Sequence, residues 1–311
     1  MRKRGLDEIY ALARKNKDVI FIGSDLGYQT LDEFKNELPN QFFMEGISEQ
    51  NLIGMASGLA QEGKIVYVNT IATFLTRRCF DQLAIDTCAG NHNVRLYANG
   101  GGVVYAPLGP THLAVDDIGL MRTLPNMTII HPSDAEEMSR AIKASESWQG
   151  PIYFRLCRGG ETVTSHENIP FEIGKAIELK KPKELVIISN GTMVFRALEV
   201  AKKLKAEGIT AGVLNVHTVK PLDQKKIKEY ILTIPNILTV EEHNVSGGLG
   251  SAVAEMIADQ LGDSKPAFKR MGFPDCYPDK YGQQDKMIQH YGLNINSIYD
   301  EALKLMKRKN L

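Results

Sequence analysis

Short apolar runs alternate with amphipathic stretches along the first half of the chain. Continuous apolar runs are typical of strands buried on both faces, and they occur at 18–25, 41–48, 64–72, 93–101, 127–133 and 151–159. Between these runs, apolar residues at helical spacing predict helices over 49–62, 74–89 and 134–148, the last with Ser133 or Asp134 as its N-cap. Strands that alternate with helices in this way predict βαβ units and a mostly parallel sheet.

A second series of the same kind follows a polar stretch with a looser pattern. It comprises a strand at 184–191, a helix at 192–208, strands at 209–223 and 235–244, and a final helix at 295–309. We therefore predict an α/β fold with two domains, each a mostly parallel sheet flanked by helices. The predicted boundaries are 1–165 for the first domain, 166–183 for the linker and 184–311 for the second domain.

The charge composition narrows the class of protein. The chain of 311 residues has 37 Lys and Arg against 37 Asp and Glu, a balance that argues against binding nucleic acid or a membrane surface. No apolar run is long enough to cross a membrane, and the N-terminus lacks the apolar core of a signal peptide. The four cysteines form no CxxC pair and are expected to pack in the core. We expect a soluble cytoplasmic protein.

One acidic residue, Glu49, lies at a predicted junction between a strand and a helix of small apolar residues. Burying a carboxylate without a partner is unfavourable, so a glutamate here raises the question of a binding role; the alternative is a helix N-cap without chemistry. Ligands of open parallel sheets bind beyond the carboxyl ends of the strands. The predicted strand ends place Glu49, Phe74, Asn99 and the loop 106–112 at that edge.

Several separated motifs resemble, in the same order, the C-terminal half of transketolase, a thiamine-diphosphate enzyme. They are EGISEQNLIGMASGLA (45–60), ATFLTRRCFDQ (72–82), GPTH (109–112), LPNMTIIHPSDAEE (124–137), GPIYFRLCRG (150–159) and VHTVKPLD (216–223). The resemblance covers the pyrimidine-binding and C-terminal domains over nearly the whole chain, as in split transketolases, whose two halves are separate chains. Deoxyxylulose-phosphate synthase and the β subunits of 2-oxoacid dehydrogenases share this domain pair.

The resemblance implies a cofactor site. The glutamate that matches Glu49 hydrogen-bonds N1′ of the cofactor aminopyrimidine and helps to activate the cofactor, which makes Glu49 an expected catalytic residue. Phe74 and Phe80 match aromatic residues that pack the pyrimidine ring, with core packing as the alternative for both. Because the two are six residues apart and do not share a helix face, Phe74, at the strand end, is the better candidate. Asp25 matches an acidic residue near the thiazolium, or it caps its own loop. Ile47 is expected to contact the cofactor as well.

On the substrate side, the resemblance implies roles for a histidine and for several arginines. His112 matches a histidine that lines the substrate channel, where it can donate to a substrate oxygen or relay a proton; a structural histidine is the alternative. Arg158 matches an arginine that grips the phosphate of sugar phosphates. Weaker candidates for the same anion, for which surface salt bridges are the alternative, are Arg77, Arg78, Arg155 and Arg2.

Two expected substrate-binding residues depart from the pattern of the relatives. Leu108 stands where relatives that use sugar phosphates carry an aspartate that reads a ketose hydroxyl, and Asn99 stands where transketolases carry a histidine. A leucine would leave that hydroxyl unpaired. We therefore expect an unusual donor or acceptor sugar, or else a local shift of the loop with an ordinary substrate.

The chain lacks the GDG segment, followed by an asparagine, with which relatives bind the diphosphate through Mg²⁺. We therefore expect no metal ligands in this chain and place them on a partner, an N-terminal transketolase subunit with the diphosphate-binding domain, in an α2β2 assembly. The predicted reaction is two-carbon ketol transfer between sugar substrates, by a transferase that is active only with that partner. Two alternatives stay open: a decarboxylating synthase or 2-oxoacid dehydrogenase β-type subunit, because FLTRRCFDQ has an arginine placed as in the synthases, and a non-catalytic scaffold subunit.

Overall fold

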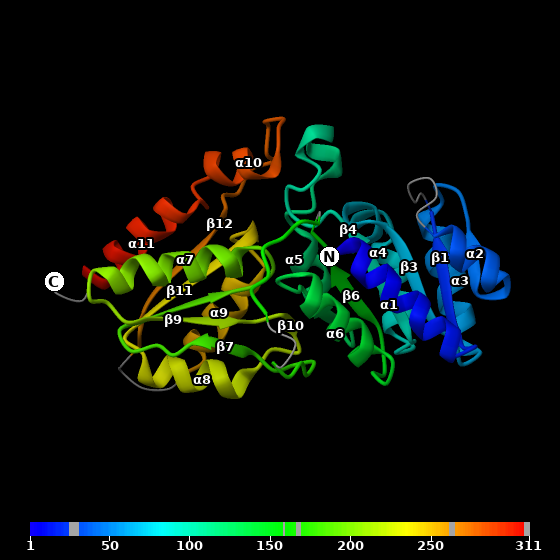
Figure 1. Cartoon of the computed structure of the whole chain (residues 1–311), viewed down its shortest axis with the longest axis horizontal. Helices are drawn as coiled ribbons and strands as arrows, with labels where there is room; N and C mark the ends of the chain where they lie inside the picture. Colours follow the sequence, from blue (N-terminus) through cyan, green and yellow to red (C-terminus); the bar gives the residue numbers. More distant parts are fainter. Residues whose placement is uncertain (25–30, 158, 166–168, 261–264, 308–311) are drawn as a thin grey trace.

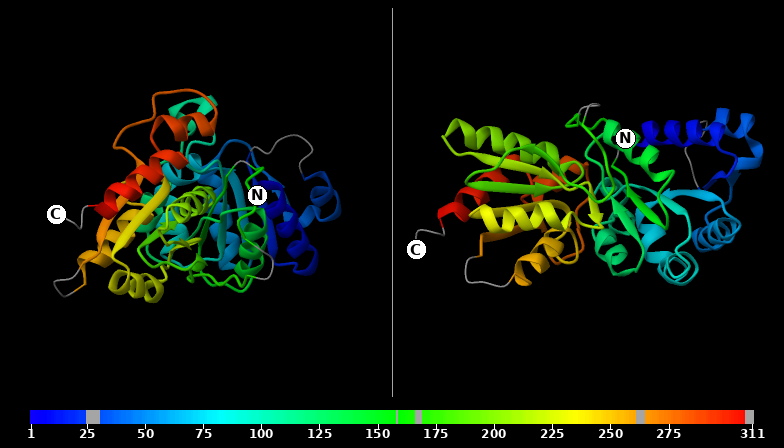
Figure 2. Two further views of the ribbon diagram at one scale, coloured as in Figure 1. Left: turned by 60° about the vertical axis from the view of Figure 1, so that its left-hand side comes forward. Right: turned by 90° about the horizontal axis from the view of Figure 1, so that it is seen from below.

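Two α/β lobes lie side by side in the computed structural model, which describes residues 1–24, 31–157, 159–165, 169–260 and 265–307 (Figure 1, Figure 2). The strands of the first sheet are β1 (Val19–Gly23), β2 (Phe42–Met44), β3 (Ile65–Ile71), β4 (Val94–Asn99), β5 (Thr128–Ile130), β6 (Ile152–Arg155) and β10 (Thr218–Lys220). Those of the second are β7 (Ile177–Lys180), β8 (Leu185–Ser189), β9 (Ala211–Asn215), β11 (Asn236–Asn244) and β12 (Ala267–Phe273).

Both sheets are mostly parallel. The first has the order β10-β5-β6-β4-β3-β1-β2 and the second the order β12-β11-β8-β9-β7. Neighbouring strands run parallel, except that β10 is antiparallel to β5 and β7 is antiparallel to β9. The predicted class, two mostly parallel sheets flanked by helices, is confirmed.

Helices cover both faces of each sheet. In the first lobe they are α1 (Arg2–Lys15), α2 (Asp32–Glu37), α3 (Glu49–Gln61), α4 (Phe80–Gln82), α5 (Asp117–Thr123) and α6 (Ala135–Ser145), with the short turns η1 (Pro39–Gln41), η2 (Phe74–Arg78), η3 (Leu83–Cys88), η4 (Ala106–Leu108) and η5 (Pro110–His112). In the second lobe they are α7 (Met193–Ala206), α8 (Gln224–Thr233), α9 (Leu249–Ala258), α10 (Gln284–His290) and α11 (Ile295–Lys307).

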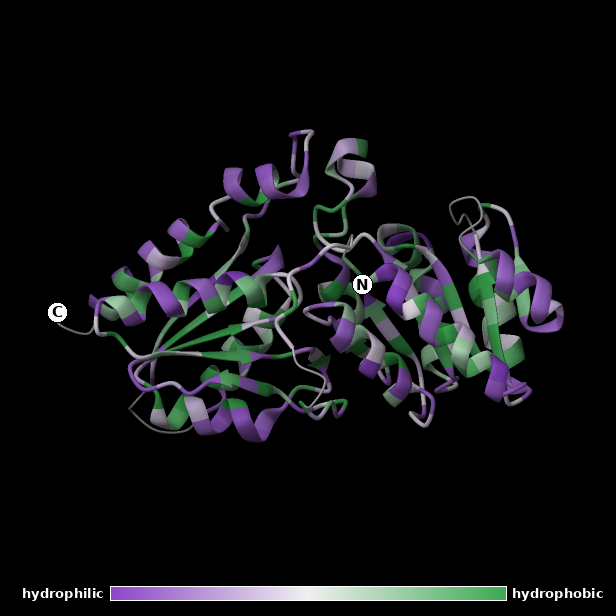
Figure 3. Cartoon of the chain, in the orientation of Figure 1, coloured by the Kyte–Doolittle hydropathy of each residue, from purple (hydrophilic) through white to green (hydrophobic). Residues whose placement is uncertain are grey.

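Alternate residues of a central strand enter two different cores, because successive side chains point to opposite faces of a sheet. Ile20 and Ile22 of β1 pack with α3 and η2, whereas Val19 and Phe21 pack with α1 and α6. The second lobe repeats the arrangement, with α7 and α11 on one face of its sheet and α8 and α9 on the other. In Figure 3 the strands are largely apolar and the helices carry polar outer faces. Continuous apolar strands are therefore explained by burial on both faces.

The start of α6 shows how the sequence fixes a helix end. Asp134 accepts a hydrogen bond from the Glu137 backbone N–H (2.9 Å), and the Ser133 backbone N–H donates to the Glu137 carboxylate (2.6 Å). This reciprocal pair satisfies amide groups that have no partner inside the helix. Asp134, and not Ser133, is therefore the N-cap.

Three segments differ from the elements that the sequence pattern indicates. The region 74–89 is wound as the π-helical stretches η2 and η3 around the short α4, and not as one α-helix. The stretch 166–183, predicted as linker, includes β7, which pairs with β9 of the second sheet. The second half of the chain also returns to the first sheet, because β10 pairs with β5. Each difference depends on pairing or packing between residues far apart in the sequence.

The cysteines are free, and Cys79, Cys88 and Cys157 are buried in the core as expected. The expectation is wrong for Cys276, which is exposed. Burial and the neighbouring Glu49 carboxylate raise the pKa of Cys79 to about 12, so this thiol stays protonated near neutral pH. None of the helices in the described part of the chain is both long and apolar enough to cross a membrane.

Candidate active site

The carboxyl ends of β1, β3 and β4 carry a connected set of polar side chains. Ser24 donates to Thr70 (2.7 Å), and Asn69 donates to the Tyr97 carbonyl (2.6 Å). Asn99, at the end of β4, donates through Nδ2 to Asn69 Oδ1 (3.2 Å). Asn99 is only 4% exposed, and its Oδ1 has no hydrogen-bond partner among the described residues. A buried acceptor without a partner is rare in folded proteins, so this edge has room for a further polar group.

A cavity of about 290 Å³ lies beside this buried amide. Its lining residues are Arg2, Asn99, Gly100, Val104, Tyr105 and Cys157. Two of the sequence candidates, Asn99 and Arg2, therefore share one hollow at the carboxyl edge of the first sheet.

Glu49 is the first residue of α3 and is 1% exposed. The helix begins here because Leu52, Ile53 and Ala56, at helical spacing, pack into the core beneath it. The amino end of a helix favours a negative charge. The Glu49 carboxylate accepts a hydrogen bond from Arg78 Nη1 and forms an ion pair with it, and the Arg78 side chain is 43% exposed.

Glu49 belongs to a row of four side chains: Glu49, Arg78, Phe74 and His112. The Arg78 guanidinium lies over the Phe74 ring, 4.4 Å from its centroid. The His112 ring stands edge-on to Phe74, with 5.3 Å between ring centroids and 64° between planes. Phe74 and Arg78 are the two ends of η2, and the wider π-helical winding puts both beside α3 while the intervening Leu75 stays in the core. Three elements thus bring an acid, a flat apolar ring and an imidazole together.

The other candidates for cofactor contact lie around this row. Phe80 is partly buried and packs against the core of the first lobe. Ile47, two residues before Glu49, is 73% exposed, and Leu108 on η4 is 54% exposed. Asp25 and Arg158 lie outside the described residues.

Arg77, the weaker anion candidate on η2, is engaged with a neighbouring acid. Its Nε and Nη2 each donate to one oxygen of Asp116 at 2.9 Å. Both side chains are partly exposed, at 32% and 40%. An anionic substrate would therefore compete with Asp116 for this guanidinium. Among the described residues, no group of three or more His, Cys, Asp or Glu is placed to hold a metal ion.

Arg155, another anion candidate, lies inside the protein. Its Nε donates to Asp117 Oδ2 (2.6 Å) and its Nη2 to Oδ1 (3.1 Å), while the Tyr153 hydroxyl donates to Oδ2 (2.7 Å). Burial acts to raise the pKa of the Asp117 carboxyl group, but the Arg155 charge outweighs it and holds that pKa below its ordinary value. Burial, reinforced by the same charge, lowers the pKa of His131 far below its ordinary value. The N–H groups of Arg155 therefore donate to partners inside the protein, so Arg155 is not placed to bind a substrate anion.

Sequence reasoning did not identify Asp117, nor the pairing of Arg78 with Glu49. Asp117 follows Asp116 at the start of a helix, and both fit the acidic first turn that any solvated helix favours. Arg78 was only one of several arginines compatible with an anion. No local spacing could have indicated either contact, because the partners are 38 and 29 residues apart in the chain.

Family models match both lobes. The transketolase pyrimidine binding domain matches residues 1–160, and the transketolase C-terminal domain matches residues 174–298. One subunit of the apulose-4-phosphate transketolase of Phocaeicola vulgatus is 35% identical over 309 residues, which is 99% of this chain and 97% of that protein. The 6-deoxy-6-sulfo-D-fructose transketolase subunit SqwH of a Clostridium species is 32% identical over 312 residues, 100% of this chain and 95% of that protein.

A solved structure described as a split gene transketolase, an inactive beta4 tetramer, superposes with a TM-score of 0.88 at 33% identity and covers 98% of this chain and 97% of that chain. The two lobes therefore define the pyrimidine-binding and C-terminal domain pair of a thiamine-diphosphate-dependent family. The chain belongs to the transketolase family, and it corresponds to the C-terminal half of a split transketolase.

Proposed function

We propose that this chain is the subunit of a transketolase-like enzyme that transfers a two-carbon ketol unit between sugar or sugar-phosphate substrates. The observation that carries the proposal is the burial of Glu49 at the start of α3, at the edge of the sheet where ligands bind, in a row with Phe74 and His112. The relatives, which are named as transketolase subunits acting on sugars, support the same class of reaction.

The residues of the row fit the aminopyrimidine half of thiamine diphosphate. The Glu49 carboxyl group offers a hydrogen-bonding partner to a ring nitrogen, and Phe74 offers a flat apolar wall. When bound, thiamine diphosphate supplies an electron sink for cleaving a carbon–carbon bond. Glu49 would hold and share the proton at N1′ of the ring, because its buried position keeps water from competing for that proton. Ile47 and Phe80 would border the ring.

We assign the diphosphate and its Mg²⁺ to a separate N-terminal subunit. The chain lacks the GDG segment that relatives use for this task. The related split gene transketolase, described as an inactive beta4 tetramer, supports a requirement for a second kind of subunit. The active assembly would be an α2β2 heterotetramer.

The substrate would lie at the His112 end of the row. His112 would donate to a substrate oxygen or relay a proton, and the buried Oδ1 of Asn99, which no described residue satisfies, would accept from a substrate hydroxyl. Arg77 and Arg158 would bind an anionic group. Leu108 offers no hydrogen bond, so the sugar lacks a hydroxyl at that place or carries another group there. Relatives named for a 6-deoxy-6-sulfo sugar and for apulose 4-phosphate support an unusual donor.

Reconstitution tests this function. Purified alone, the chain will show no ketol transfer; with an N-terminal subunit from the same organism, thiamine diphosphate and Mg²⁺, it will transfer a two-carbon unit to an aldose. The donors to compare are xylulose 5-phosphate, 6-deoxy-6-sulfofructose, apulose 4-phosphate and pyruvate, with products followed by mass spectrometry. Full activity of the single chain would contradict the need for a partner. Turnover of pyruvate alone, with release of carbon dioxide, would favour the synthase or 2-oxoacid dehydrogenase alternative.

Replacing Arg78 with alanine will tighten the binding of thiamine diphosphate to the reconstituted pair by about two- to tenfold. Arg78 competes with the aminopyrimidine for both of its expected contacts, because it pairs with the Glu49 carboxylate and covers the Phe74 ring. Its side chain must turn away when the ring binds, and a half-buried ion pair and a cation–π contact are then lost. Titration calorimetry measures the change.

The matched control for that titration is Arg14→Ala. Arg14 lies on α1, which packs on the opposite face of the first sheet from α3, and it forms an exposed ion pair with Glu37 of α2. Loss of the Arg14 side chain should leave cofactor binding unchanged. Weaker binding in Arg78→Ala would show that Arg78 helps to hold the cofactor and does not compete with it.

A further inference from the structure

The segment 103–115 belongs to the first lobe by sequence but is built into the core of the second. Val103, Ala106, Leu113 and Val115 are at most 4% exposed and pack in one cluster with apolar residues of β8, α7 and α11. The same segment carries η4 and η5, and therefore Leu108 and His112. Its position thus depends on side chains of the second lobe.

A buried carboxylate of the second lobe anchors the base of this segment. Glu242 of β11 is 1% exposed and accepts a hydrogen bond from the Val103 backbone N–H (2.9 Å). It also accepts from the Thr192 hydroxyl (2.9 Å) and, with both oxygens, from the Gln284 amide (2.9 Å each). The preceding Gly102 has φ +68°, and a Cβ there would lie 2.3 Å from Glu242 Oε1. Only glycine lets the backbone approach this carboxylate so closely.

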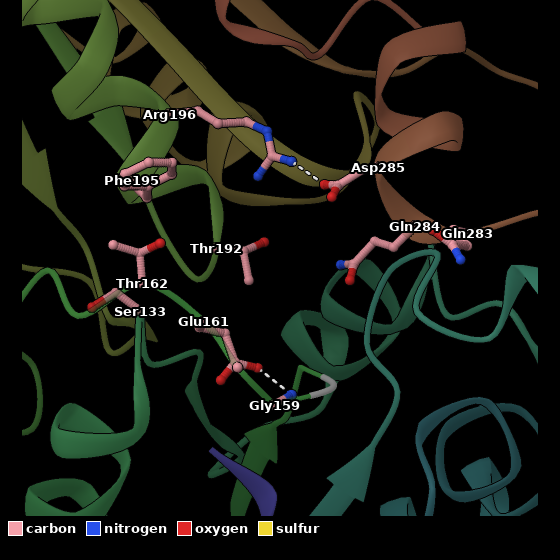
Figure 4. A pocket seen from close by; sticks show the side chains of 11 residues that line it. Ser133, Gly159, Glu161, Thr162, Thr192, Phe195, Arg196, Gln283, Gln284 and Asp285 are labelled. Carbon is pink, nitrogen blue, oxygen red and sulfur yellow. Dashed lines mark hydrogen bonds and ion pairs between the residues drawn. The ribbon is translucent and has the colours of Figure 1, made fainter.

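These donors are uncharged and come from three separate segments of the chain. A buried carboxylate is tolerated when its oxygens are satisfied by hydrogen bonds. Loss of the Gln284 amide would leave Glu242 short of donors, so the carboxylate would draw in water and loosen its hold on Val103. In Figure 4, Gln284 extends towards Thr192 across a cavity of about 310 Å³ between the lobes.

The tip of the segment is covered by the residues just before Gln284. The Tyr281 ring lies over the Cα of Gly109, so a Cβ added there would be 2.7 Å from Tyr281 Cε1. The Gly109 carbonyl in turn accepts from the His112 backbone N–H (3.1 Å). In Figure 1 and Figure 2, α10 and the turn before it stand beside the η4–η5 loop. Residues 281–284 therefore touch both the tip of the segment and the carboxylate at its base.

We propose that Glu242, Gln284 and Tyr281 of the second lobe are positioning residues for the substrate half of the site. They hold the segment 103–115 so that His112 stands against Phe74, 5.3 Å between ring centroids. The C-terminal domain thereby sets how tightly a sugar is held. The role of His112 rests on the proposed function; the restraint on the segment does not.

Hydrogen–deuterium exchange of the full chain tests the restraint without any activity. Gln284→Ala and Tyr281→Ala should each speed exchange of the amides in 103–115 by about tenfold, whereas Tyr281→Phe, which keeps the ring, should not. The matched control is Asp285→Ala: Asp285 follows Gln284 but is 87% exposed and pairs with Arg196 (2.7 Å). Unchanged exchange of 103–115 in both alanine variants would overturn the proposal.

Kinetics of the reconstituted pair test the consequence. In Gln284→Ala and Tyr281→Ala the KM for the sugar donor should rise about five- to tenfold, with the affinity for thiamine diphosphate unchanged, because Glu49 and Phe74 are untouched. An equal loss of cofactor affinity, or a fall in kcat alone, would contradict a role in holding the substrate. If no donor is turned over by any form, the proposed function fails, while the exchange experiment still decides the restraint.

Discussion

Replacing Glu49 with glutamine will lower the ketol-transfer rate of the reconstituted pair by a factor of about 10²–10⁴. Glutamine has nearly the same shape as glutamate, but it cannot hold and return a proton at N1′ of the aminopyrimidine. The site is buried, so water is a poor substitute for the missing carboxyl group. The initial rate at saturating donor and cofactor measures the effect, and circular dichroism and size-exclusion chromatography establish that the variant folds and pairs normally.

Glu62→Gln is the matched control, since Glu62 ends the same helix α3 and is exposed. It should retain full activity. Undiminished activity in Glu49→Gln would instead favour a scaffold subunit that completes the complex without taking part in the chemistry.

Replacing Asp117 with alanine will destabilise the chain by about 3–5 kcal/mol, because it leaves the buried Arg155 guanidinium without its counter-charge. Tyr153 loses its acceptor in the same step. The second lobe is affected as well, since Arg155 also donates to the Glu242 backbone carbonyl (2.9 Å). Urea unfolding followed by circular dichroism measures the shift.

The neighbouring residue supplies the comparison. Asp116 forms a bidentate pair with Arg77, but both side chains are partly exposed, so Asp116→Ala should cost no more than about 1 kcal/mol. Equal losses of unfolding free energy in the two variants would mean that burial does not make the Asp117–Arg155 pair more important for stability than the exposed Asp116–Arg77 pair.

Much of the fold could be read from the order of residues. The apolar runs predicted the strands of the first sheet and β8, β9 and β11 of the second, because parallel strands are buried on both faces. They did not predict the edge strands β7 and β12, which are only partly buried and lack a continuous apolar run. The cap at Asp134 and the placement of Glu49 at the start of α3 are likewise local, since they depend on residues within one helical turn. The motifs shared with transketolases indicated the domain pair that the family models match.

Contacts between distant residues could not be predicted in this way. No periodic pattern of residues indicates three such contacts: the pairing of Arg78 with Glu49, the packing of 103–115 into the core of the second lobe, and the pairing of β10 with the first sheet.

The sequence by itself therefore determined the central strands of the two sheets, the helix starts at Asp134 and Glu49, and the acid at the edge of the first sheet, because hydrophobic periodicity and capping act over a few residues. Only the tertiary structure decided which arginine faces that acid and which domain holds His112 in place. Those choices depend on packing and on the need to satisfy buried charges, and both bring together groups that are far apart along the chain.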